Sequence, residues 1–329
     1  MHCELIVPSL FATATEARYP ALELLLARGR RESAESRTLE QWLRQAFEQP
    51  GEALAAGALS LAAHGGSPGE RWWARADPVH LRVMRDRAIV APGEALEVAS
   101  DEADALVEAL NRHFAGAVEF RVLEPRRWVA RLEPGTGVTE GPALYAAGRD
   151  AAIARGEEGL RAALLTEIQM LLHAHPVNEA REARGEPALN SLWIWGGGQP
   201  PRAAHGPWRS VAAADPSALG LAQLAGMRGL DLPPSAAAWL DLLPVDGRHL
   251  AVLDVLRVPT ALEQQAEYGV GIEALERLWF APLLAALRAE RIGMVTLRVP
   301  DAAPGAGFET VRGDLRRFWR RPRALGRYA

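Results

Sequence analysis

The stretch from His173 to Gly198, HAHPVNEAREARGEPALNSLWIWGGG, combines imidazole, amide, guanidinium and indole side chains with three consecutive glycines. Together these groups could recognise an anion. A guanidinium fork matches phosphate or carboxylate oxygens, and a glycine-rich turn can present backbone N–H groups. The candidates for ligand contact in this stretch are His175, Asn178, Arg181, Asn190, Trp193 and Trp195.

Most of these candidates also have a purely structural interpretation. His175 continues the apolar spacing of the preceding helix, so a buried, hydrogen-bonded histidine is an equal alternative to a ligand contact. Asn178 stands where it could cap a helix that begins at the next residue. Trp193 and Trp195 alternate along a predicted strand, a pattern that favours core packing over ring stacking.

Three further candidates precede this stretch. Asp77 and His80 lie at the entrance of a predicted strand, where the carboxylate could orient the imidazole; a turn-stabilising contact is favoured over a catalytic dyad. Arg127, with Arg181 and Arg202, is a better anion partner than the glycine turn. The histidine spacing gives no metal signature, so no metal or cofactor is predicted.

The segment Arg312–Arg327 alternates arginine with Phe318 and Trp319. Such a pattern could dock on nucleic acid or on an acidic protein partner. A terminal helix that is pinned by the two aromatic rings, with solvated arginines around it, is the favoured interpretation.

Composition limits the class of partner. The 329 residues are 49% apolar and 24% charged, and all 37 basic residues are arginine. The net charge of −4 argues against a general nucleic-acid or acidic-membrane binder. Cys3 is alone, and the sequence shows neither a secretory leader nor an uncharged apolar run of about 18 residues. We therefore expect a soluble, cytoplasmic protein.

The elements that would position these residues alternate in type. Strands are predicted at 5–7, 250–256 and 294–299, and helices at 20–29, 39–47 and 271–290, which favours a parallel sheet with covering helices. Residues 77–131 instead follow the order strand, strand, helix, strand, strand, and a long amphipathic helix is predicted at 157–173. We expect an α/β core from 1–72 and 205–329, with a smaller α+β domain at 73–204 inserted into it.

The motif HPVNxxRxxxGxPxxNSxWxWGxG, which lies within 175–198, resembles the signature of the archaeal-type cofactor-independent phosphoglycerate mutases of the alkaline phosphatase superfamily. A closer resemblance is to the RpfE-type regulatory proteins. The shared segments are ADPVHL at 76–81, QMLLHxHPVN at 169–178, NSLWIWGGG at 190–198 and RFWRRP at 317–322. Both resemblances imply an alkaline-phosphatase-like core with an inserted substrate-type domain.

Resemblance to working mutases also implies two divalent metals, a serine nucleophile near the first strand and a late Asp-His pair. Here Pro8-Ser9-Leu10 and Asp301-Ala302-Ala303 stand at those places, and Ser9 has no neighbouring base in the sequence. The leading hypothesis is therefore a noncatalytic, mutase-like regulatory protein that binds a small phosphorylated or carboxylated ligand or a protein partner.

Two other classes of function stay open. The first is a metal-dependent phosphoryl-transfer enzyme, a mutase or a phosphatase, whose ligands have moved to the ends of the core strands. The second is a scaffold without any ligand. The residues that the enzyme would use are Asp215, Asp246, His249, Asp254 and Asp301.

Overall fold

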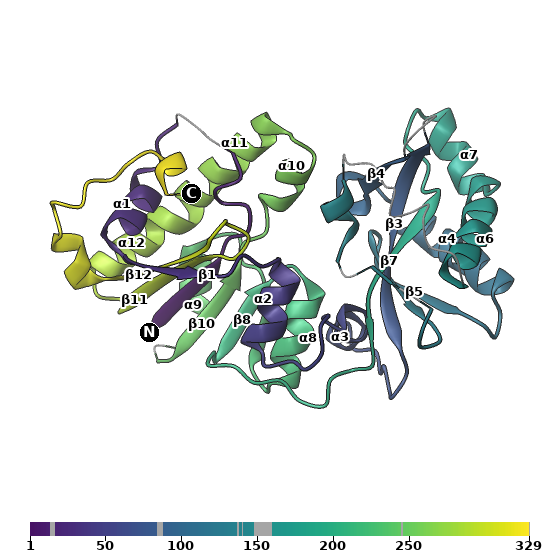
Figure 1. Cartoon of the computed structure of the whole chain (residues 1–329), viewed down its shortest axis with the longest axis horizontal. Helices are drawn as coiled ribbons and strands as arrows, with labels where there is room; N and C mark the ends of the chain where they lie inside the picture. Colours follow the sequence, from purple (N-terminus) through teal and green to yellow (C-terminus); the bar gives the residue numbers. More distant parts are fainter. Residues whose placement is uncertain are drawn as a thin grey trace. The chain divides into compact units, whose positions relative to one another are not determined.

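The computed structural model describes residues 1–13, 17–83, 88–136, 138–139, 141–147, 160–244 and 246–328. The chain forms two compact units (Figure 1). The core unit comprises Met1–Pro50 and Ala203–Ala329, and the inserted unit comprises Gly51–Arg202.

A seven-stranded sheet in the order β2-β12-β11-β1-β10-β8-β9 forms the centre of the core unit. Neighbouring strands are parallel except along β12, which runs antiparallel to both β11 and β2. Side chains alternate between the faces of a strand, so β1 places Cys3 and Leu5 in the main apolar core and Glu4 on the opposite face. The strands are β1 (His2–Ile6), β2 (Arg30–Ala34), β8 (Ser210–Ala213), β9 (Arg228–Asp231), β10 (Arg248–Val252), β11 (Met294–Val299) and β12 (Gly305–Val311).

Helices cover both faces of this sheet (Figure 1). The face with Leu5 packs against α1 (Pro20–Arg28), α9 (Ala236–Leu242), α11 (Gln265–Leu275) and α12 (Ala281–Arg288). On the other face lie α2 (Leu39–Ala46) and α8 (Pro216–Leu224), and the short α10 (Arg257–Ala261) precedes α11. The single helix expected at 271–290 is instead α11 and α12 joined by a π-helical turn at Glu276–Phe280. The predicted α/β class, with a parallel sheet and covering helices, is confirmed.

The inserted unit is built on a five-stranded antiparallel sheet around the long strand β3. β3 pairs with β4, β6 and β7, and β5 pairs with β6. Apolar residues of α4 and α6 share one core with this sheet. The elements are α3 (Ala56–Ala63), β3 (Trp73–Val83), β4 (Ala88–Pro92), α4 (Ser100–His113), β5 (Glu119–Glu124), β6 (Arg127–Arg131), α6 (Leu160–His173), α7 (Pro176–Ala183) and β7 (Ser191–Gly198).

The first boundary between the units lies at Pro50, not near residue 72 as expected. Helix α3 explains the difference, because it packs on β3 and β7 of the inserted unit. A Cβ atom on Gly57 would lie 2.4 Å from the backbone carbonyl carbon of Ala74, so a glycine is needed for this close approach. The second boundary lies at Arg202, two residues before the expected one.

The C-terminal segment also differs from expectation. It contains two short 3-10 turns, Arg312–Arg316 and Leu325–Arg327, in place of a terminal helix. Phe318 and Trp319 are 76% and 65% exposed, so they do not pin the segment; Leu325 and Tyr328 are its buried anchors.

Residues 157–159 of the long helix expected after the α+β segment lie outside the described residues. Within the described parts of the chain, none of the helices has the length and apolarity that a membrane crossing requires.

Candidate functional site

Asp77 is buried at the centre of the inserted unit, and its carboxylate joins three strands. It accepts hydrogen bonds from Nε and Nη2 of Arg75 at 3.1 and 2.7 Å, from the Trp195 indole at 2.8 Å and from the backbone N–H of Trp128 at 3.3 Å. The Arg75 guanidinium also lies 5.3 Å from the centre of the Trp195 ring. Because β3, β6 and β7 each contribute a partner, this cluster fixes the strands against one another.

His80 and Asn190 hold the backbone near the far end of β3. Nδ1 of His80 lies 2.8 Å from the carbonyl oxygen of Ala188, and since a carbonyl only accepts, Nδ1 carries the proton. The Asn190 amide accepts from the Leu81 N–H at 2.7 Å and donates to the Leu81 carbonyl at 2.9 Å. The Asp77 carboxylate accepts from Arg75 and Trp195 and does not orient His80. The expected contact between Asp77 and His80 is therefore absent, and each side chain makes its own structural contact.

His175 caps α7, which begins at Pro176 and not at the expected Glu179. Its Nδ1 accepts from the backbone N–H of Val177 at 3.2 Å, and burial, with a smaller effect of Arg112, lowers its pKa, which favours the neutral acceptor form.

Asn178 is consequently a residue of α7 and not its cap. Its buried side chain donates to the carbonyls of Leu172 and Leu189 at 2.8 and 3.1 Å and accepts from the Leu189 N–H at 2.7 Å. The amide therefore fastens α7 to the chain on both sides of it.

The predicted anion-binding arginines have partners or lie at the surface. Arg181 is 1% exposed and donates to the backbone oxygens of Pro187 and Glu97 at 2.9 and 2.8 Å and to the Glu102 carboxylate. Half-buried Arg127 pairs with Glu124 at 2.9 Å, whereas Arg202 is exposed.

Trp193 completes the set of signature residues. Its indole donates to the Gly141 carbonyl at 2.9 Å, and its ring is buried in the inserted unit, as is that of Trp195. The structural interpretation of the two tryptophans is confirmed. The polar groups of the signature thus make their contacts within the inserted unit, where they position its helices and strands.

The carboxyl ends of the core strands carry Ser9 and Asp301. Ser9 follows β1 with a positive φ of 63°, and its backbone N–H lies 2.9 and 2.8 Å from the two Asp301 oxygens. The Ser9 hydroxyl donates to Asp301 at 3.1 Å. A non-glycine residue in the left-handed region at a strand end is a feature of functional sites.

Two of the other acidic candidates, Asp215 and Asp254, also follow the carboxyl ends of core strands, β8 and β10. Asp215 caps α8 by accepting from the Ser217 N–H at 2.8 Å, and Asp246 is exposed. His249 is buried near the amino end of β10, 2.8 Å from the Ser210 hydroxyl, and its pKa is lowered chiefly by burial. Asp254 follows the opposite end of that strand. In the described portion of the chain, no three His, Cys, Asp or Glu side chains are grouped so that they could hold a metal.

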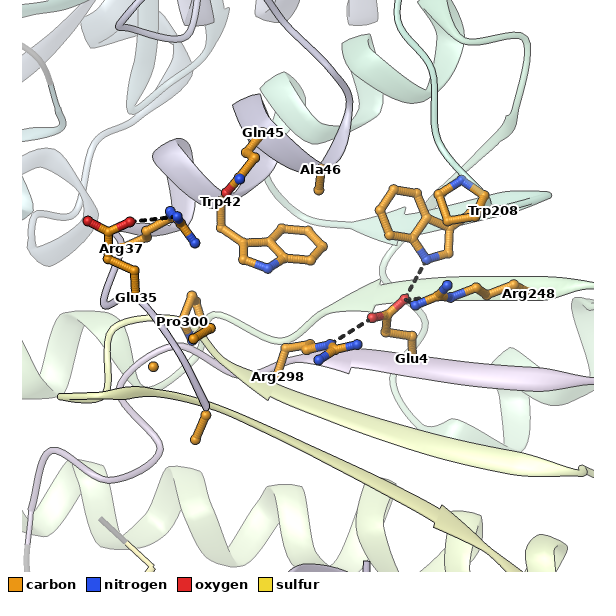
Figure 2. Close-up of a pocket in the computed structure, with 14 residues that line it drawn as sticks. Glu4, Glu35, Arg37, Trp42, Gln45, Ala46, Trp208, Arg248, Arg298 and Pro300 are labelled. Atoms are coloured by element: carbon orange, nitrogen blue, oxygen red, sulfur yellow. Dashed lines mark hydrogen bonds and ion pairs between the residues drawn. The ribbon is translucent and has the colours of Figure 1, made fainter. Parts of the chain in front are cut away.

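A pocket of about 310 Å³ lies over the polar face of the core sheet (Figure 2). Figure 2 shows the rings of Trp42, from α2, and Trp208 on one side of it, and the side chains of Glu4, Arg248 and Arg298, from β1, β10 and β11, on the other. The two ring centres are 5.9 Å apart. Indole rings and sheet-borne guanidinium groups thus face the same cavity.

Glu4 organises the floor of this pocket. Its carboxylate is almost completely buried and accepts from the Trp208 indole at 2.7 Å, from Nε of Arg248 at 2.9 Å and from Nε of Arg298 at 3.1 Å. Arg298 continues to Glu32 at 2.9 Å, so an ion-pair network fixes both guanidinium groups.

The rim of the pocket carries a further ion pair. Arg37 pairs there with Glu35, whose side chain is mostly exposed. This rim and floor, which the sequence analysis missed, could have been suspected from one signal: Glu4 is a lone carboxylate in the otherwise apolar strand CELIV.

Comparison with known proteins defines the fold. No protein-family model and no curated protein matches the chain. PH0037 protein from Pyrococcus horikoshii has a similar structure, with a TM-score of 0.58 and 13% sequence identity over 94% of this chain and 87% of that protein. The chain shares the fold of PH0037. A cofactor-independent phosphoglycerate mutase from Thermoplasma acidophilum DSM 1728 aligns with a TM-score of 0.44 and 17% identity over 95% and 90% of the two chains.

Proposed function

We propose that this chain is a noncatalytic, phosphoglycerate-mutase-like regulatory protein that binds a small phosphorylated or carboxylated ligand. The observation that carries the proposal is the pocket of Figure 2, where Arg37, Arg248 and Arg298 line a cavity of about 310 Å³ beside two indole rings. This volume is near the lower end of the usual range for small-molecule sites, about 300–1,000 Å³.

The guanidinium groups of the pocket suit an anion of this size. Arg248 and Arg298 contribute two positive charges to the floor, which Glu4 and Glu32 balance while they hold both guanidinium groups in place. Arg37 adds a third guanidinium at the rim, where its partner Glu35 is mostly exposed and therefore screened by solvent. Because an Arg fork holds carboxylate or phosphate in a fixed geometry, one acidic group on a compact ligand would complete the network.

The noncatalytic part of the proposal rests on the strand ends. The Asp301 carboxylate accepts from both the N–H and the hydroxyl of Ser9, so it links the segments that follow β1 and β11. Asp215 serves as a helix cap, and His249 lies near the opposite end of the sheet from Asp301. His249 is thereby separated from the strand ends, and among the described residues no three acidic or imidazole side chains form the metal-binding group that such a phosphoryl-transfer site would need.

A thermal-shift titration tests ligand binding. We expect 3-phosphoglycerate, phosphoenolpyruvate or a similar compact acid to raise the melting temperature, because a ligand at about 100 times its Kd adds roughly 2.7 kcal/mol of stability. Arg37→Ala should abolish the shift. Arg112→Ala is the matched control, because Arg112 also forms a 2.7 Å ion pair but lies in the inserted unit. An equal shift in the Arg37 variant would exclude this pocket, and no shift with any such acid would favour a scaffold without a ligand.

The rival function, a metal-dependent phosphoryl-transfer enzyme, is favoured by one observation. Ser9 has a left-handed backbone conformation at the carboxyl end of β1, and its hydroxyl lies 3.1 Å from the Asp301 carboxylate. A carboxylate so placed could accept the hydroxyl proton during attack on a phosphorus atom. Stoichiometric manganese, cobalt or zinc in the purified protein, together with phosphatase activity that Ser9→Ala removes, would establish the rival.

We place the protein in the cytoplasm, where the buried thiol of Cys3 would stay reduced. A protein partner is the alternative to a small metabolite as the regulatory ligand. A co-purification experiment in which a partner is displaced by Trp42→Ala, in the absence of any small-molecule response, would support that alternative.

A further inference from the structure

The C-terminal segment forms one wall of a second, larger pocket in the core unit. Its volume is about 710 Å³, and five of the nine residues that line it are arginine: Arg31, Arg320, Arg321, Arg323 and Arg327. No Asp or Glu belongs to the lining, so the formal charge of the lining side chains is +5. A concentration of one charge sign in a concave site raises the local concentration of oppositely charged ligands.

Most of these arginines are not engaged by carboxylates of the protein. Arg320 donates to the Gly29 carbonyl at 2.9 Å, and Arg31 lies 5.7 Å from the centre of the Phe308 ring. Among the described residues, no acidic side chain forms an ion pair with Arg321, Arg323 or Arg327, and all three are exposed. In contrast, both floor arginines of the Figure 2 pocket pair with Glu4. A bound polyanion would relieve the mutual repulsion of Arg321, Arg323 and Arg327.

The pocket is formed by well-anchored backbone. Leu325 is fully buried, and the hydroxyl of buried Tyr328 accepts from the Arg323 N–H at 3.0 Å and donates to the Glu23 carbonyl at 3.4 Å. Arg317 donates to the Arg28 carbonyl at 3.3 Å and thereby ties the segment to the end of α1 (Figure 1). Because its backbone is fixed before any ligand arrives, binding would order side chains only and not the chain itself.

An aromatic ring also faces solvent at this pocket. Trp319 lines it and is 65% exposed, although an indole of this size is usually covered in a folded protein. An exposed indole offers a stacking surface for a planar ring, and a nucleobase has such a ring beside its phosphates. The charge and the ring together select a more specific ligand than either feature alone.

We propose that this arginine-lined pocket binds a nucleoside polyphosphate, with the phosphates held by Arg321, Arg323 and Arg327 and the base stacked on Trp319. Several guanidinium groups match several phosphate groups, and the volume suits a mononucleotide. The negative charge of the whole chain, −4, disfavours a long nucleic acid. The proposal is independent of the Figure 2 pocket, because none of the residues that line one pocket lines the other.

Isothermal titration calorimetry with the full chain tests this assignment. ATP, inorganic tripolyphosphate, adenosine and a 15-residue oligothymidylate serve as probes. We expect ATP to bind about tenfold more tightly than tripolyphosphate, because stacking of the base on Trp319 adds to the affinity of the phosphates. Adenosine, which has no phosphate, should show no measurable binding. The ATP affinity should fall steeply as salt rises. No heat with ATP, equal affinities for ATP and tripolyphosphate, or tighter binding of oligothymidylate than of ATP would overturn the proposal.

Paired variants locate the ligand. The double variant Arg321→Ala/Arg323→Ala should lose at least about tenfold in affinity for both ATP and tripolyphosphate. Trp319→Ala should reduce ATP binding to the tripolyphosphate level. Arg288→Ala is the control, since this exposed residue does not line the pocket, and the variant should bind ATP as the unaltered chain does. Unchanged ATP affinity in the double arginine variant would contradict the assignment, and Arg37→Ala should leave ATP binding intact.

Discussion

The carboxylate of Asp77 and the indole N–H of Trp195, 118 residues apart in the chain, meet at 2.8 Å inside the inserted unit. The same carboxylate neutralises buried Arg75. Asp77 and Trp195 were both candidates for ligand contact in the sequence, yet their polar groups satisfy each other. The side chains that were expected to bind a ligand therefore form the contacts that hold the sheet together.

We expect Asp77→Ala to destabilise the inserted unit by about 3–5 kcal/mol, because the substitution breaks the buried ion pair with Arg75 and leaves the Trp195 indole N–H without its acceptor. Urea unfolding followed by tryptophan fluorescence measures this loss. Asp101→Ala, at an exposed position in the first turn of α4, should cost well under 1 kcal/mol. A stable Asp77 variant that had lost only ligand binding would show that Asp77 contacts ligand.

Arg181 in α7 and Arg184, which follows the end of this helix, provide a matched pair, since both contact Glu102. Arg181→Ala should cost about 3–5 kcal/mol, because its guanidinium is buried and satisfies two carbonyls besides the carboxylate. Arg184→Ala should cost no more than about 1 kcal/mol, since that side chain is about half exposed. Equal unfolding free energies for the two variants would contradict the structural role of Arg181.

Acid should destabilise the protein through its histidines. Burial lowers the pKa of His249 in the folded state, so protonation favours the unfolded chain. Its stabilising contribution is fully present above the ordinary histidine pKa of about 6.5 and is lost as pH falls from there toward the folded-state pKa. Unfolding free energies measured between pH 8 and 5 should decline below about 6.5.

The slope of that decline identifies the residue. His249→Gln should flatten it, whereas His205→Gln, at an exposed position of the same unit, should leave it unchanged. His2 and His175, whose pKa values are also lowered chiefly by burial, should account for the part of the slope that remains. An identical slope in the His249 variant would mean that folding does not lower the pKa of this imidazole.

Glu4→Gln should change stability and ligand affinity in opposite directions. Loss of the carboxylate leaves Arg248 and Arg298 without their shared partner, so the free energy of unfolding should fall by about 3 kcal/mol. The same change adds one net positive charge to the pocket floor, so a small acid should bind severalfold more tightly. Calorimetry and urea unfolding on one preparation test both effects. Weaker binding of every acid would indicate that Glu4 itself contacts the ligand.

The sequence predicted the elements with strong apolar patterns. Leu5 to Val7 indicated the central strand, and the pattern at 39–47 indicated the helix α2. The edge strand β2, RRESA, was missed because its side chains are mostly exposed and show no apolar alternation, and β12 was missed because glycines interrupt its pattern. These strands form through pairing with partners far along the chain, which local patterns do not encode.

The site was harder to predict than the fold. The motif predicted ligand contacts for Arg181 and Asn178, whose side chains instead form hydrogen bonds within the inserted unit. No local pattern in the sequence indicated that Arg248 and Arg298 would both contact Glu4. The prediction for the C-terminal segment was wrong for a related reason. The alternation of arginine and aromatic residues suggested a helix pinned by Phe318 and Trp319, whereas Leu325 and Tyr328 are the buried residues that anchor the segment. Convergence of distant residues depends on strand order, which no single segment specifies.

The most direct test of the central claim is an assay of 3-phosphoglycerate interconversion with 2-phosphoglycerate by the purified chain in manganese, cobalt or zinc, alongside Ser9→Ala. Our account predicts that the chain and the variant give the same background rate, while 3-phosphoglycerate or a related acid still stabilises both in a thermal scan. Turnover by the chain that Ser9→Ala abolishes would contradict it.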